Sequence, residues 1–129
     1  MASFLDEIGI VPALCATGAA PGGFRQEILS VIENTREAPQ VVEDTDFMTM
    51  LETARGVGAE IVIGNSNGYF LARKLGIPMV RAGFPIHDRI GGQRILHVGY
   101  RGAQQLFDRI VNTLIEAGQE ASPVGYSYI

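Results

Sequence analysis

Tryptophan is absent from this 129-residue sequence, and cysteine occurs once, as Cys15. A single cysteine cannot form an internal disulfide, and alone it cannot hold an iron–sulfur cluster or a structural zinc ion. Cys15 lies in the apolar run 9–17 (GIVPALCAT), which is typical of a strand. We therefore expect a buried, unreactive thiol. The alternative is a ligand shared with another subunit across an interface.

Charge is also scarce, because charged residues make up 19% of the chain and the net charge is −4. Nucleic-acid binding would need a basic stripe, and crossing a membrane as a helix would need an apolar run of about 18 residues. The sequence has neither feature, so we expect no nucleic-acid partner and no membrane contact. The N-terminus lacks the basic and apolar regions of a signal peptide, which predicts a cytoplasmic protein.

Apolar residues make up 47% of the chain, and the pattern alternates short apolar runs with helical periodicity. The sequence predicts strands at 10–16, 40–43, 60–64 and 77–80, and helices at 4–8, 24–34, 47–54, 69–75 and 103–117. This order is typical of an α/β fold. We expect an open, doubly wound, Rossmann-like (flavodoxin-like) parallel sheet of about four strands with helices on both faces, in a single domain over 1–129.

Glycines mark the expected helix ends. Gly9, Gly58 and Gly76 follow helical runs, and Gly118 follows the strongest run. The expected apolar stripe of that run consists of Leu106, Ile110, Val111 and Leu114.

Segment 83–102 (GFPIHDRIGGQRILHVGYRG) fits neither a helical nor a strand period. Long irregular segments in compact domains are often functional or interface loops, although a solvated connection is the plain alternative. His87, Asp88 and Arg89 are adjacent in sequence, so in an extended chain they point in different directions and form no preformed triad. The arginines of this segment can bind carboxylates or phosphates through the paired N–H groups of the guanidinium, or form salt bridges across a subunit interface.

Two turns follow predicted strands, where ligands gather in open parallel sheets. Turn 17–23 (TGAAPGG) either accepts an anion through backbone N–H groups or is kept small for close packing. Turn 64–68 either caps the next helix or bonds a ligand or facing domain. The interface or ligand-binding candidates are Asn65, Ser66, Asn67, Gly68, Arg81, His87, Asp88, Arg89, Arg94, Tyr100 and Arg101.

Catalytic and metal motifs are missing. The chain has no G-x-G-x-x-G, no P-loop and no nucleophile elbow, and His87 and His97 stand ten positions apart without a carboxylate at metal-site spacing. We predict no catalytic residue and no metal ligand in this chain.

Four strings carry a family resemblance: IGNS at 63–66 with Gly68, LGIP at 75–78, RAGFPIHDR at 81–89 and VGYRGA at 98–103. With Asn112 in the last helix, they make the run from 46 to about 112 resemble the C-terminal Rossmann-like domain of nitrogenase component-1 type proteins. The G-F-P-x-x-D-R and G-Y-x-G elements are similar to its β-type subunits. Among these the scaffold that assembles the iron–molybdenum cofactor is the nearest, and the catalytic molybdenum–iron subunit is second.

The resemblance implies a role in cofactor assembly or nitrogen fixation, as the C-terminal domain of a longer subunit. It implies an α-type partner subunit and sister domains, and an iron–sulfur or iron–molybdenum cluster in the full complex with no cofactor in this chain alone. Cys15 does not match the family's cluster cysteines. We expect the isolated chain to form homo-oligomers and to have no activity of its own. The alternative is a freestanding flavodoxin-like domain that binds a small anionic ligand.

Overall fold

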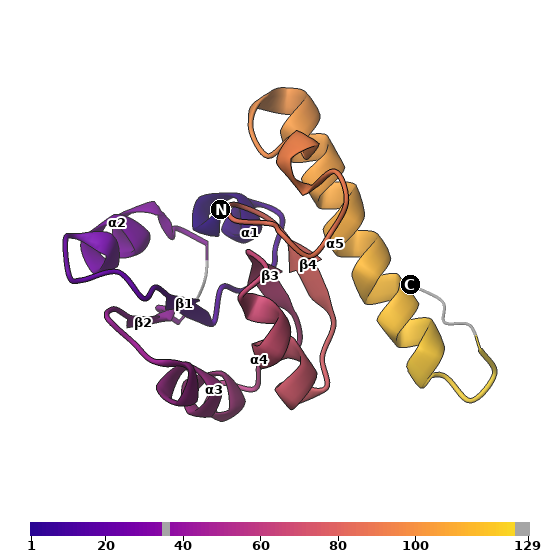
Figure 1. The fold of residues 1–129 in the computed structure, drawn as a ribbon, viewed down its shortest axis with the longest axis horizontal. Coiled ribbons are helices and arrows are strands. Elements are labelled where there is room, and N and C mark those ends of the chain that lie inside the picture. The colour runs from indigo at the N-terminus through magenta and orange to yellow at the C-terminus, as the bar shows by residue number, and fades with distance from the viewer. Residues whose placement is uncertain (35–36, 126–129) are drawn as a thin grey trace. The chain divides into compact units, whose positions relative to one another are not determined.

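The computed structural model describes residues 1–34 and 37–125, and the chain divides into two compact units, Met1–Ala59 and Glu60–Ile129 (Figure 1). Each unit has helices and one pair of parallel strands, so the predicted α/β class is confirmed. Within the described ranges, no helix is both long enough and apolar enough to cross a membrane.

The first unit contains α1 (Ala2–Glu7), β1 (Leu14–Ala16), α2 (Phe24–Val31), β2 (Gln40–Val42) and α3 (Phe47–Gly56). β1 and β2 are parallel, with Cys15 opposite Val41. Val41 is buried, and the Cys15 thiol is half-buried, so desolvation raises its pKa. Cys15 is therefore less buried than expected, and the raised pKa of its thiol favours the protonated form.

Asp6 and Asp46 hold the ends of helices in this unit. Asp6 is only 5% exposed, and its Oδ2 accepts the backbone N–H groups of Glu33 and Asn34, each at 2.8 Å, just after α2 ends. Asp46 is the N-cap of α3 and accepts the Thr49 N–H at 2.7 Å. A carboxylate at an N-cap satisfies an N–H group that has no partner inside the helix, so Asp46 stabilises the start of α3.

The second unit contains β3 (Val62–Gly64), α4 (Gly68–Leu75), β4 (Met79–Arg81), the short 3₁₀ helix η1 (Gly92–Arg94) and α5 (Gly99–Ala121). β3 and β4 are parallel, with Ile63 opposite Val80. The core of this unit is apolar, and it consists of Leu71, Ala72, Val80, Ala82, Ile86, Leu106 and Ile110. Leu106 and Ile110 of the stripe predicted on the last helix are buried, whereas Val111 is half-buried and Leu114 is 37% exposed.

All four predicted strands are present, but they are shorter than expected and form two separate pairs among the described residues, β1 with β2 and β3 with β4. The single sheet of about four strands is therefore not confirmed. Residues 10–13 have strand composition but lie outside β1, although Ala13 O accepts the Gln40 N–H at 2.9 Å. Apolar composition alone does not fix where a strand begins.

The glycine predictions differ in outcome. Gly76 ends α4 in the left-handed conformation, with φ of 67°, as predicted. Gly118 does not end α5, which continues to Ala121, because an isolated glycine costs only about 1 kcal/mol inside a packed helix. α5 also begins at Gly99, four residues before the expected start. Tyr100 and Arg101 therefore lie in its first turn and not in the preceding loop.

Candidate functional site

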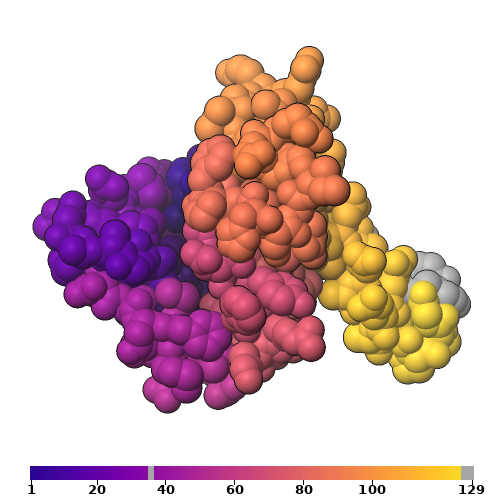
Figure 2. All heavy atoms as spheres, in the orientation of Figure 1, coloured from indigo at the N-terminus to yellow at the C-terminus, as the bar shows by residue number. Residues whose placement is uncertain are grey.

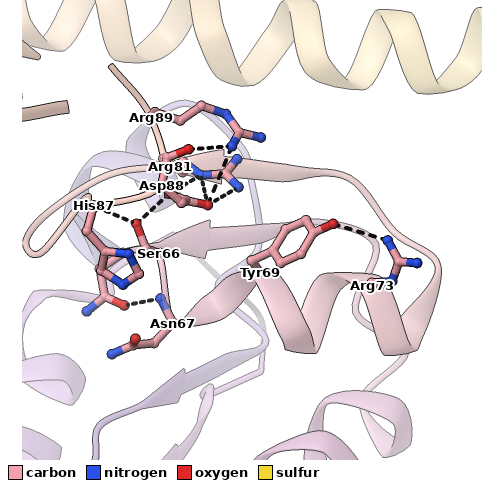
Figure 3. Close-up of polar contacts among 9 residues, drawn as sticks. Ser66, Asn67, Tyr69, Arg73, Arg81, His87, Asp88 and Arg89 are labelled. Carbon is pink, nitrogen blue, oxygen red and sulfur yellow. Dashed lines mark hydrogen bonds and ion pairs between the residues drawn. The ribbon is translucent and has the colours of Figure 1, made fainter. Parts of the chain in front are cut away.

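Three side chains meet beyond the C-terminal ends of β3 and β4, where the sequence predicts a site. Arg81 ends β4, and its Nε donates to Oδ1 and Oδ2 of Asp88, both at 3.0 Å, while its Nη2 donates to Oδ2 at 2.6 Å (Figure 3). The Arg81 side chain is 12% exposed and that of Asp88 is 27% exposed. The guanidinium thus uses its planar fork on a carboxylate of its own chain.

Ser66 completes this cluster from the turn after β3. Its side chain is buried, and its Oγ donates to Asp88 Oδ1 at 2.6 Å and accepts the His87 N–H at 3.0 Å (Figure 3). The Ser66 N–H donates to Pro85 O at 3.0 Å. One residue therefore binds the segment 85–88 at three points, which fixes the start of the long loop against the sheet.

The neighbouring asparagines serve the same turn. Asn65 Oδ1 accepts the Asn67 N–H at 3.0 Å, and Asn65 Nδ2 donates to Phe84 O at 3.1 Å. Asn67 is the N-cap of α4 but makes no side-chain cap bond, so helix capping does not explain these residues. A Cβ atom on Gly68 would lie 3.1 Å from Met79 Cε, so this position is tight.

Hydrogen bonds from Arg81, and then from Ser66, hold the pKa of Asp88 well below its usual range. The carboxylate stays charged at neutral pH and accepts bonds on both oxygens. A group that remains ionised and already paired is poorly suited to transfer protons. The cluster of Ser66, Arg81 and Asp88 therefore has the chemistry of a structural ion pair.

Sequence reasoning did not identify Tyr69 and Arg109 as members of this region. The Tyr69 ring lies 5.6 Å from the Arg81 guanidinium carbon, and Tyr69 Oη accepts from Arg73 Nη1 at 3.2 Å. Arg109 Nη1 donates to Arg81 O at 2.7 Å. Arg109 stands three positions after Leu106, next to the buried stripe of α5, and that spacing was the available signal.

The other candidates, in the loop and in the first turn of α5, have few internal partners. Arg89 donates to Asp88 O at 2.7 Å, yet its side chain remains 57% exposed. The His87 side chain is exposed, and Tyr100 is 99% exposed. Arg94 and Arg101 are exposed and make no ion pair within residues 1–34 and 37–125. The structure thus brings Ser66, Arg81 and Asp88 together and leaves these residues facing solvent.

His97 fastens the far part of the loop. Its Nε2 accepts the Gly83 N–H at 3.3 Å, and its ring meets the Phe84 ring edge to face at 6.0 Å. The Phe84–Pro85 peptide bond is cis. Burial, and secondarily the charge of Arg109, lowers the pKa of His97, which favours the neutral acceptor form.

Turn 17–23 in the first unit is held by a side-chain hydroxyl of its own and by a backbone bond to Asp44. Thr17 Oγ1 accepts the Ala19 N–H at 3.1 Å, and Ala19 O accepts the Asp44 N–H at 3.0 Å. Cβ atoms on Gly18 and Gly22 would meet neighbours at 3.9 and 3.8 Å, which is ordinary contact, so close packing does not require these two glycines. Nothing in the described geometry of this turn points to an anion.

The potential metal ligands of the described residues do not come together. No group of three or more His, Cys, Asp or Glu residues among them is placed to hold a metal ion. The residues present do not fit an iron–sulfur or iron–molybdenum cluster, so any such cluster would need ligands from elsewhere.

The sequence model of the family described as "Nitrogenase component 1 type Oxidoreductase" matches residues 1–115. The chain therefore belongs to this family, as the motifs indicate.

Nitrogenase beta chains and a cofactor biosynthesis protein are among the relatives that match. The nitrogenase molybdenum–iron protein beta chain of Methanothermobacter thermautotrophicus is 39% identical over 87% of this chain and 24% of its own length. The iron–molybdenum cofactor biosynthesis protein NifN of Sinorhizobium fredii is 37% identical over 77% of this chain and 22% of its own. A solved structure, "Nitrogenase Cp1 at pH 6.5", is similar over 99% of this chain and 28% of its own, with a TM-score of 0.88 and 31% identity. The chain spans about a quarter of the length of these proteins.

Proposed function

We propose that this chain forms one domain, the C-terminal one, of a β-type subunit in a nitrogenase component-1 type complex. It serves iron–molybdenum cofactor assembly or nitrogen fixation through contacts between domains and subunits. The similarity to both catalytic beta chains and NifN supports the β-type assignment. In the whole subunit, we expect the four strands to belong to one open, doubly wound sheet.

The pairing within the cluster of Ser66, Arg81 and Asp88 carries the proposal of a non-catalytic domain. Its polar groups bond one another, and the pKa of Asp88 is held far from neutrality. A catalytic acid or base needs a pKa near the working pH and a free position for substrate. The cluster offers neither, so its contribution is to hold the loop that follows β4.

The iron–sulfur or iron–molybdenum cluster that the family implies is bound, in this proposal, by other parts of the complex. Cys15 stands alone as a thiol ligand, and the described residues provide no ligand set. The partners we propose are an α-type subunit and the sister domains of the β-type subunit, in the cytoplasm. The isolated chain is proposed to self-associate, because it exposes large apolar side chains.

The test is the intact mass of the native polypeptide and of whatever purifies with it. The proposal expects a polypeptide about four times the 13.9 kDa of this chain, since relatives are matched over about a quarter of their length. It also expects an α-type subunit in stoichiometric amount. A native product of 13.9 kDa that purifies alone and gains thermal stability with a flavin or nucleotide would overturn it in favour of a freestanding ligand-binding domain.

A further inference from the structure

We propose that residues 89–101, called here the docking segment, are the contact surface for a partner protein whose docking face carries both carboxylates and apolar side chains. This inference rests on the proposed function, because it names the surface through which the domain meets another subunit. Figure 2 shows the atoms of this segment, in orange, at the molecular surface.

Apolar side chains in the docking segment are unusually exposed. Ile90 is 100% exposed, Tyr100 99% and Val98 84%, within eleven consecutive residues. Scattered exposed apolar residues are common, but several nearly uncovered ones in one short segment are typical of a binding surface. Tyrosine is also enriched at the centres of protein interfaces, since its ring is apolar and its hydroxyl can still bond.

The charge of the segment is opposite to that of the chain. Arg89, Arg94 and Arg101 lie within it, and it contains none of the fourteen acidic residues of a chain whose net charge is −4. Arg94 and Arg101 are exposed and form no ion pair in the described ranges. Guanidinium groups bind carboxylates through paired hydrogen bonds, so the fitting partner surface is acidic.

A second copy of this chain fits the surface less well. A two-fold dimer places the same patch of both copies face to face, which would set the arginines of one copy against those of the other. Like charges across an interface cost free energy. Charge complementarity therefore favours a different protein, and we take the α-type subunit of the same complex as the probe.

The backbone of the segment is fixed before any partner binds. A Cβ atom on Gly92 would lie 2.5 Å from Ile86 Cγ2, so η1 sits directly on the buried Ile86. The Arg94 N–H donates to Gly91 O at 2.9 Å, and His97 Nε2 accepts from Gly83. A surface that is already ordered loses little entropy on binding, which raises affinity.

The experiment uses the full subunit that carries these residues and the purified α-type subunit, with the dissociation constant measured at low and high salt. The test variant is Arg94→Glu with Arg101→Glu, and a second variant is Tyr100→Ser. The control is Arg55→Glu with Lys74→Glu, which makes the same charge change at exposed positions on α3 and α4. Thermal unfolding of each variant checks that the fold is retained.

We expect the arginine variant to weaken α-subunit binding about tenfold or more and to lose most of the salt dependence. Tyr100→Ser is expected to weaken binding at both salt concentrations, and the control is expected to bind like the wild type. If the arginine variant and the control bind the α-type subunit equally well, the inference about the docking segment is wrong, while the proposed function still stands. An arginine variant that loses self-association but still binds the α-type subunit like the wild type would also overturn the inference, in favour of a second copy as the partner. If even the wild-type subunit does not bind, the proposed function fails together with the inference.

Discussion

Gly102→Ala is expected to destabilise the second unit, although alanine is normally the better helix residue. Gly102 is buried in the first turns of α5, and a Cβ atom there would lie 2.9 Å from His97 C, 3.2 Å from His97 N and 3.4 Å from His97 Cα. Carbon atoms pack best at about 3.5–4.0 Å. All three neighbours are backbone atoms, so no side-chain rotation relieves the contact, and either α5 or the backbone at His97 must shift.

The magnitude follows from two opposing effects. Overpacking of this kind costs about 1–3 kcal/mol. Replacing glycine by alanine inside a helix returns up to about 1 kcal/mol. The free energy of unfolding should therefore fall by about 1 kcal/mol, and the loss should appear first in the amides of α5 and of residues 95–98.

Gly56→Ala is the matched control, because Gly56 is the last residue of α3 and nothing lies within 4 Å of its Cβ position. The same chemical change should leave stability unchanged or slightly raised there. Urea unfolding followed by circular dichroism measures the difference, and hydrogen exchange of α5 amides reports on the second unit alone. Gly102→Ala as stable as Gly56→Ala would refute the argument from close approach.

Three further predictions concern the core and the loop. Ile110→Ala should lower the free energy of unfolding by about 2–5 kcal/mol because Ile110 is fully buried, whereas Leu114→Ala, at a site 37% exposed, should cost clearly less in the same urea titration. Ser66→Ala should speed proteolysis within 83–98, since the His87 N–H loses its acceptor; an unchanged cleavage rate would show that the loop is held elsewhere. The contribution of His97 to the free energy of unfolding should be full above pH 6.5 and should fall as the pH drops below it, because the pKa of His97 is lowered in the fold and the unfolded chain takes up the proton first. His97→Gln should reduce the slope of the free energy of unfolding against pH in this range. An equal slope in both proteins would show that other groups cause it.

Helix positions were predictable where apolar periodicity and local chemistry agree. Asp46 caps α3 and Gly76 ends α4, and each acts through bonds or dihedrals within a few residues of itself. Strand lengths were less predictable, because a strand is defined by its partner. The apolar run begins at residue 10, whereas the register with β2 covers only Leu14–Ala16. The early start of α5 was missed for a similar reason. Gly99 has φ of 73°, and the sequence does not show that a helix begins at such a residue.

The candidate site was found by position but not by role. Ligands usually bind at the C-terminal ends of parallel strands, and this rule led to Ser66, Arg81 and Asp88 as candidates. The structure brings these three side chains together. Their mutual pairing could not be read from the sequence, because the spacing of 15 and 7 residues carries no information on which side chain turns inward. Arg109 was missed because an arginine on a helix is usually solvated, and only the packing of α5 shows that it reaches Arg81 O.

The strings that identify the family divide into two sets of residues with different physical roles. In G-F-P-I-H-D-R, Gly83 adopts φ of 80° and Asp88 pairs with Arg81, so these residues shape the loop. In G-Y-R-G, Gly99 and Gly102 allow the turn and the close approach that start α5. Tyr100 and Arg101 stand between those glycines and have no internal task in the described structure. A motif whose glycines fix the backbone while its bulky side chains face solvent presents a binding surface. The docking segment has this arrangement and the cluster of Ser66, Arg81 and Asp88 does not, so the docking segment is the part of the domain to test for partners.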